Sequence, residues 1–109
     1  MRKIEQTMVN AVNNGRDWRS GNTSVDVTDH GVVVRLHGNK IAQLDTEDRI
    51  LWITDAGWQT TTTKSRLNAL LAGVTAGRAS IHQSKFVWYL TTESETVEMD
   101  RRDSYAVAI

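Results

Sequence analysis

The residues best suited to binding chemistry gather where a helix is predicted to begin, in the run from Trp58 to Leu71 (WQTTTTKSRLNALL). A helix N-terminus presents unpaired backbone N–H groups and a partial positive charge. A phosphate or carboxylate bound there would be held by nearby hydroxyls and cations: Thr62, Thr63, Ser65, Lys64 and Arg66. In the structural alternative, Thr61 or Thr62 only caps the helix and the two cations lie on its solvated face.

The other reactive side chains show no catalytic spacing. His30, His37 and His82 lie in three separate segments and form no HxH or HExxH pair. The chain has no GxSxG serine, no glycine-rich phosphate loop and no cysteine. We therefore predict a non-enzymatic protein with no catalytic, cofactor-binding or metal-binding residue. A small nucleotide-acting enzyme is the minor alternative, with His37 or Asp55 as general base beside the helix start.

Four tryptophans form the second group of interest. Trp52 and Trp88 fall within predicted strands and are expected in the core. Trp18 and Trp58 lie in connections beside polar stretches. If exposed near a cation such as Arg19, they would stack on nucleic-acid bases or anchor a protein partner. If buried, they would close the end of a small core, with each indole N–H bonded to a carbonyl.

Two helices are predicted from the spacing of apolar residues. Ile4, Met8, Ala11 and Val12 fall on one helical face, and Gly15 is the expected left-handed residue after that helix. The second helix begins at the threonine run and is expected to end at Gly73. Its inward face is formed by three leucines: Leu67, Leu70 and Leu71.

The strands follow from alternation of apolar and polar residues. Residues 24–28 and 32–37 alternate around Asp29-His30-Gly31 and predict a hairpin. Residues 50–53 are apolar on both faces, which is typical of a central, covered strand. Phe86, Trp88 and Leu90 predict another strand by their alternation. Shorter strands are expected at 40–44, 97–99 and 105–108.

These elements predict one α+β domain over residues 1–109. We expect a mainly antiparallel sheet of five to seven strands, with the two helices packed on one face. The C-terminal segment Tyr105–Ile109 would be an edge strand that could pair across a two-fold axis to give a homodimer.

The net charge of the chain limits the classes of partner that it is expected to bind. The chain carries 13 basic and 13 acidic side chains, so it is neither a strongly basic nucleic-acid binder nor a strongly acidic DNA mimic. It has no apolar run near the ~20 residues that a membrane span needs. Its first residues lack the apolar region of a signal peptide. We therefore expect no membrane partner and a cytoplasmic location.

Four motifs in order resemble a group of small tailed-bacteriophage proteins. They are KIEQ (3–6), WRSGNT (18–23), LHGNKIA (36–42) and WQTTTTKSRLNAL (58–70). The resemblance extends from the N-terminus to Leu71. It implies a phage gene product and supplies no catalytic residue, cofactor or reaction. Small phage proteins of this kind commonly act by binding host machinery through their surfaces.

The sequence thus predicts a phage accessory protein in the host cytoplasm that binds a host macromolecule, first of all a protein, for takeover or anti-defence. The predicted partner-binding residues are Trp18, Arg19, Asn22, Trp58, Thr62, Lys64 and Arg66. The alternative is a small nucleic-acid-binding module that uses the same surface. Its affinity would fall steeply with salt, because phosphate contacts release counterions.

Overall fold

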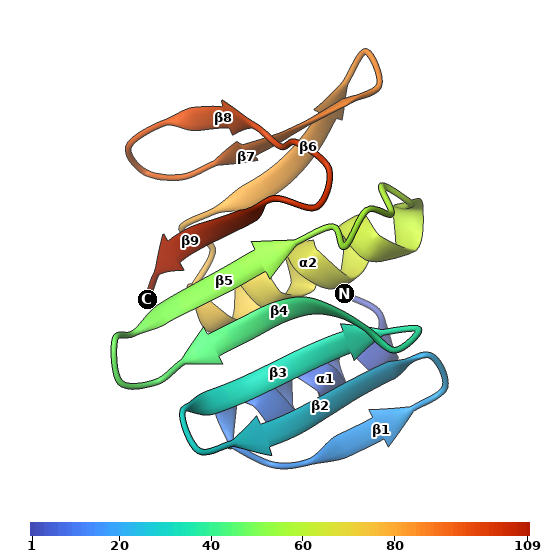
Figure 1. Ribbon diagram of the computed structural model, residues 1–109, viewed down its shortest axis with the longest axis vertical. Helices are drawn as coiled ribbons and strands as arrows, with labels where there is room; N and C mark the ends of the chain where they lie inside the picture. Colours follow the sequence, from blue (N-terminus) through green and yellow to red (C-terminus); the bar gives the residue numbers. More distant parts are fainter.

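The computed structural model describes residues 1–109 and contains two helices and nine strands (Figure 1). The first half holds α1 (Lys3–Asn13) and five strands: β1 (Trp18–Ser20), β2 (Thr23–Thr28), β3 (Gly31–Leu36), β4 (Asn39–Asp45) and β5 (Ile50–Thr54). The second half holds α2 (Thr61–Val74) and four strands: β6 (Ser80–Ser84), β7 (Val87–Thr91), β8 (Thr96–Glu98) and β9 (Ser104–Ala108). Neither helix is long and apolar enough to cross a membrane.

The strands form two antiparallel sheets. One has six strands in the order β1-β2-β3-β4-β5-β9, and the other has three in the order β6-β7-β8. The predicted α+β class is confirmed. The single sheet expected from the sequence is divided, because β6 to β8 run as short hairpins that pair only with one another. The predicted C-terminal strand, β9, does lie at an edge of the larger sheet.

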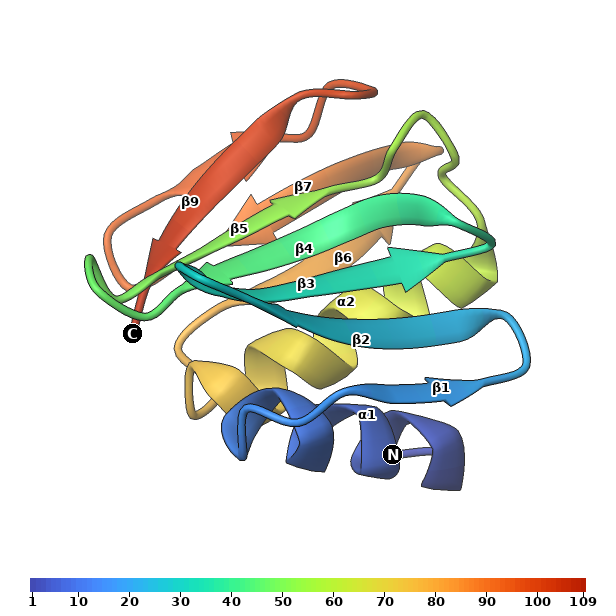
Figure 2. The ribbon, with the colours of Figure 1, turned by 60° about the horizontal axis from the view of Figure 1, so that its bottom comes forward.

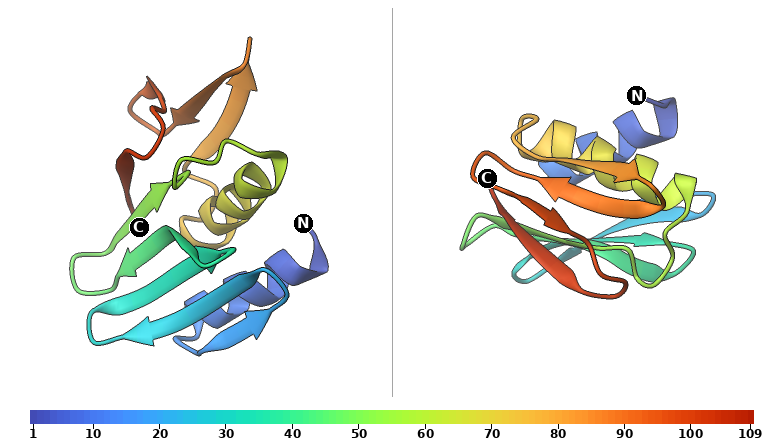
Figure 3. Two further views of the ribbon diagram at one scale, coloured as in Figure 1. Left: turned by 45° about the vertical axis from the view of Figure 1, so that its right-hand side comes forward. Right: turned by 90° about the horizontal axis from the view of Figure 1, so that it is seen from above.

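The helices lie side by side on one face of the six-stranded sheet, and no element covers the opposite face (Figure 2). The three-stranded sheet closes the side of the molecule next to α2 and β9 (Figure 3). Asn68 of α2 fixes it there through two hydrogen bonds to Ile81 of β6: its amide donates to the carbonyl at 2.9 Å and accepts from the N–H at 2.7 Å. One hydrophobic core unites the helices and both sheets.

The open face of the larger sheet corrects the expectation for β5. Leu51 and Ile53 point into the core, but Trp52 between them is 41% exposed. This strand is therefore covered on one face only, and the prediction that Trp52 lies in the core is wrong. Trp88 is buried as expected.

The predicted strand containing Phe86 also begins later than expected. Phe86 lies in the turn before β7, with a left-handed φ of 70°, and its side chain is 91% exposed. Its alternation with Trp88 suggested an inward side chain, but a turn residue does not follow the two-residue period of a strand.

The ends of α2 differ from the prediction by one to two residues. Thr60 is the N-cap, and its hydroxyl accepts a hydrogen bond from the Thr63 N–H at 3.1 Å. The helix continues through Gly73 to Val74. A Cβ on Gly73 would lie 2.3 Å from Cγ1 of Val9 in α1, so the glycine lets the two helices approach closely.

A buried ion pair connects the helices to the start of the sheet. Arg66 of α2 donates from Nη1 to Oε2 of Glu5 in α1 at 2.8 Å, and both side chains are about 95% or more buried. The Arg66 Nε donates to the hydroxyl of Thr23 in β2 at 3.1 Å. The Ser65 hydroxyl donates to the same Glu5 oxygen at 2.6 Å. Arg66 is therefore a structural residue.

The environment of Glu5 sets its protonation. Burial on its own raises the pKa of this carboxyl, but the opposing effects outweigh it. These are hydrogen bonds from Ser65, Arg66 and the Arg2 backbone N–H, together with the Arg66 charge. The pKa is therefore below the ordinary value of 4.5, and Glu5 stays ionised in the folded protein.

Substituting Gly73→Ala should destabilise the protein, because the new methyl group would collide with Val9. Overpacking of this kind destabilises a protein by about 1–3 kcal/mol. The higher helix propensity of alanine compared with glycine offsets up to about 1 kcal/mol of this loss. The substitution Val9→Ala makes room, so the double variant should be more stable than the sum of the two single effects predicts. Urea unfolding of all three variants measures this coupling. Additive effects would contradict close contact at Gly73.

Replacing Glu5→Gln should destabilise the protein at neutral pH by about 3–5 kcal/mol, because it leaves the Arg66 charge buried without its partner. The unfolded chain protonates Glu5 near 4.5, whereas the folded chain does so only at lower pH. The contribution of the pair is therefore complete above that value and is lost as the pH falls through the folded-state pKa. Urea midpoints of both proteins, from neutral to acidic pH, should converge below 4.5. A constant difference would contradict the ionised pair.

Candidate functional site

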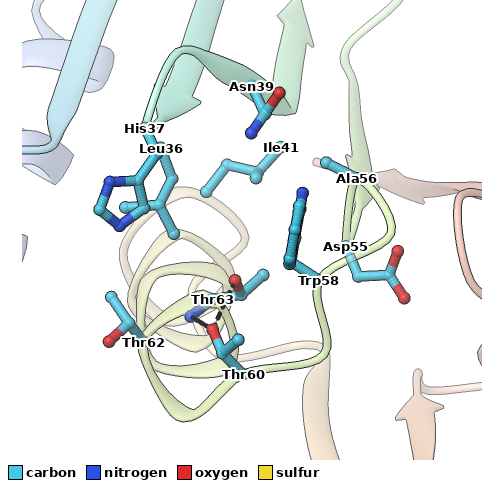
Figure 4. Close-up of a pocket in the computed structure, with 10 residues that line it drawn as sticks. All are labelled: Leu36, His37, Asn39, Ile41, Asp55, Ala56, Trp58, Thr60, Thr62 and Thr63. Atoms are coloured by element: carbon cyan, nitrogen blue, oxygen red, sulfur yellow. Dashed lines mark hydrogen bonds between the residues drawn. The ribbon is translucent and has the colours of Figure 1, made fainter.

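A surface cavity of about 460 Å³ lies at the N-terminal end of α2 (Figure 4). Three segments enclose it: the β3–β4 turn, the loop from β5 to α2, and the first turn of the helix. Its apolar lining comes from the exposed Trp58, from Ala56 and from the buried Leu36 and Ile41, and its polar rim from His37, Asn39 and Thr62. The cavity therefore combines an apolar surface with hydrogen-bonding groups, which is the usual composition of a binding site.

The β3–β4 turn positions two of the rim residues, His37 and Asn39. Leu36 and Asn39 pair across the hairpin, so His37 and Gly38 form its two-residue turn, with φ angles of 52° and 80°. The His37 N–H donates to the Asn22 carbonyl at 2.7 Å, which ties this turn to the neighbouring β1–β2 turn. The exposed imidazole consequently stands at the edge of the cavity (Figure 4).

Asp55 organises the loop that carries Trp58. Its Oδ1 accepts hydrogen bonds from the N–H groups of Gly57 at 2.6 Å and Arg102 at 2.8 Å. Its Oδ2 accepts from the Gln59 side chain at 3.0 Å. The carboxylate is 1% exposed and points away from the cavity, with the Trp58 ring beside it (Figure 4). Asp55 is thus engaged in holding the loop.

Trp58 remains at the surface as a result. The Trp58 N–H donates to the Asp55 carbonyl at 2.9 Å, which fixes the backbone, while the indole is 61% exposed. Trp58 was expected either to contact a partner or to close the end of the core. Contact with a partner requires an exposed side chain, and this side chain is exposed. No group of three or more histidine or acidic side chains in the chain is placed to hold a metal ion.

The other predicted partner-binding residues are dispersed. Thr62 lines the cavity, and the ammonium group of Lys64 donates to the Gln83 side chain of β6 at 3.1 Å. Arg19 is exposed and lines a separate polar hollow of about 560 Å³, which shares His37 with the first cavity. The predicted surface is therefore divided between two neighbouring hollows and the tip end of β6.

Three of the predicted partner-binding residues are buried or half-buried. The prediction that Arg66 is accessible to a ligand is wrong, because its guanidinium is buried against Glu5. Asn22 is half-buried, and its side-chain oxygen accepts from the Thr23 hydroxyl at 2.8 Å. Trp18 is half-buried and packs against the hydrophobic core.

Residue-by-residue reasoning overlooked Leu36, Asn39 and Ile41 as site residues. They belong to the LHGNKIA motif, which the resemblance singled out without giving it a role. The structure brings this motif and the Trp58 run to the same cavity. The signal was present in the sequence, but the meeting of the two segments depends on the β3–β4–β5 register.

Comparison with known proteins agrees with the origin inferred from the motifs. A family model described as Kyanoviridae Gp96 protein matches residues 1–107. Comparisons with curated proteins and with solved structures give no significant match. The expectation of a phage protein family is confirmed. The chain belongs to the Kyanoviridae Gp96 family of phage proteins.

Proposed function

We propose that this phage protein is a non-enzymatic accessory factor that binds a host protein in the host cytoplasm through the Trp58 cavity. The observation that carries the proposal is the exposure of the Trp58 indole beside a cavity with an apolar surface. Tryptophan is enriched among residues that dominate binding energy, and such residues sit in or beside pockets that exclude water.

The polar rim supports recognition of a specific partner. His37, Asn39 and Thr62 lie around the exposed Trp58 indole and the cavity floor, where the core residues Leu36 and Ile41 reach the cavity. This arrangement of an apolar centre and a hydrogen-bonding edge is typical of protein interfaces. The His37 and Trp58 backbones are both anchored by hydrogen bonds, so the site is preorganised and loses little conformational entropy on binding.

Charge favours a protein over a nucleic acid. A nucleic-acid surface needs several cations to contact phosphates. Arg66, one of the predicted cations, is neutralised by Glu5, and Lys64 is bonded to Gln83. The cavity is lined by no Lys or Arg side chain. An apolar, neutral site is better suited to a side chain of another protein.

Substituting Trp58→Ala should weaken host-protein binding by about 30-fold or more, which corresponds to a hot-spot loss of about 2 kcal/mol. The test is capture of host proteins from a nuclease-treated host lysate by the tagged chain, followed by affinity measurement with the retained protein. The thermal midpoint should change little, because the indole is mostly exposed.

Trp52→Ala is the matched control, because it removes an exposed tryptophan from the open sheet face. It should leave binding unchanged. Equal binding by Trp58→Ala and the unsubstituted protein would overturn the proposed site. Retention that disappears on nuclease treatment would instead favour nucleic acid as the ligand.

A further inference from the structure

The tip of the β6–β7 hairpin is made of two residues that disfavour its geometry. Ser84 pairs with Val87, so Lys85 and Phe86 form a two-residue turn. Both have left-handed backbones, with φ angles of 49° and 70°. Turns of this kind favour Asn-Gly or Asp-Gly, and a bulky residue in that conformation is strained. These are the only adjacent non-glycine residues in the chain with positive φ, so turn stability does not explain their identity.

The Phe86 side chain is also exposed to solvent although it is apolar. It is the chain's single phenylalanine and is 91% exposed, the highest value among the exposed large apolar residues. An aromatic ring gains free energy when its surface leaves water. Here folding does not provide that gain, whereas contact with another molecule would.

The tip lies on the same side of the molecule as the Trp58 cavity, beyond the N-terminal end of α2 (Figure 1). It projects at the same side of the molecule as the β3–β4 turn and the N-terminal end of α2 (Figures 1 and 2). Gln83, two residues before the tip, accepts the hydrogen bond from Lys64 of α2. Asn68 fixes the base of the same strand through Ile81. The hairpin therefore presents Phe86 from a stem anchored on the helix that borders the cavity.

The tip itself carries a cation, Lys85, directly before Phe86. Residues 56–92 contain no aspartate or glutamate. Within this segment Arg66 is paired with Glu5, and Arg78 lies 3.9 Å from Glu93. Of the other two cations, Lys85 is in the tip, and Lys64 donates to Gln83 close to it. A partner surface that accommodates Phe86 would therefore be complementary if it carried carboxylates around an apolar pocket.

We propose that the Lys85–Phe86 tip is a second anchor of the binding surface, and that Phe86 inserts into an apolar pocket with an acidic rim on the partner protein. This inference rests on the proposed function, since it assigns a further contact to the same partner. The two left-handed residues reduce the stability of the hairpin in return for presenting an aromatic ring and a cation at its end.

The test uses the protein retained from nuclease-treated host lysate and three variants of the tip. Phe86→Ala should weaken its binding at least tenfold. The double variant Lys85→Asn with Phe86→Gly restores favoured turn residues, so it should lose binding equally while its thermal midpoint rises. Lys85→Glu should weaken binding more at low salt than at high salt, because salt screens exposed charges.

Val27→Ala is the control, because it trims an exposed apolar side chain outside this surface. It should bind as the unsubstituted protein does. Binding unaffected by Phe86→Ala but lost in Trp58→Ala would overturn this inference and leave the proposed function standing. Failure of the unsubstituted chain to retain any nuclease-resistant protein would overturn both. A lower thermal midpoint in the double variant than in the unsubstituted protein would show that Lys85 and Phe86 do not destabilise the hairpin, and would overturn that part of the inference.

Discussion

The Glu5–Arg66 ion pair is the contact on which the arrangement of both helices against the sheet depends. It joins α1 to α2 at 2.8 Å, and Arg66 also reaches Thr23 at the start of β2. Removing two charges from water is costly, and the cost is recovered only when the remaining donors and acceptors are bonded. Here Ser65, Thr23 and Asn22 complete the set. No buried side-chain polar atom in the chain lacks a partner, so the pair fixes one relative placement of three elements.

That placement determines which end of α2 is free to bind. The close contact at Gly73 and the ion pair at Arg66 hold the helix against α1 along its length. Its first turn, one helical turn before Arg66, consequently projects beside the β3–β4 turn and borders the cavity. The bonded Asp55 sets the loop before it. The candidate site is thus made of rigid segments whose positions follow from buried contacts elsewhere.

The sequence allowed prediction of the local elements but only part of the site. The period of α1 and the alternation in β2 and β3 were sufficient, because each depends on neighbouring residues. Lys64 and Arg66 looked equivalent as cations of one helix start. They are two residues apart and therefore face different directions, and burial of Arg66 required Glu5, 61 positions away. Trp52 and Trp88 both occur in apolar strands, and only the layer arrangement shows that one of them faces solvent.

Two exposed aromatic residues that folding does not account for, Trp58 and Phe86, lie on one side of the molecule (Figure 1). Many other features of the sequence agree with the structure: Thr60 caps α2, Gly15 follows α1 with positive φ, and the core is filled mainly by aliphatic residues. By contrast, Trp58 is exposed in a loop held by hydrogen bonds to Asp55, and Phe86 is exposed in a turn with a left-handed backbone. Natural sequences tend to break such rules where function requires it. Since both aromatic residues lie on the side of the molecule where α2 begins (Figure 1), a single partner that contacts both, as proposed, would account for the two departures together.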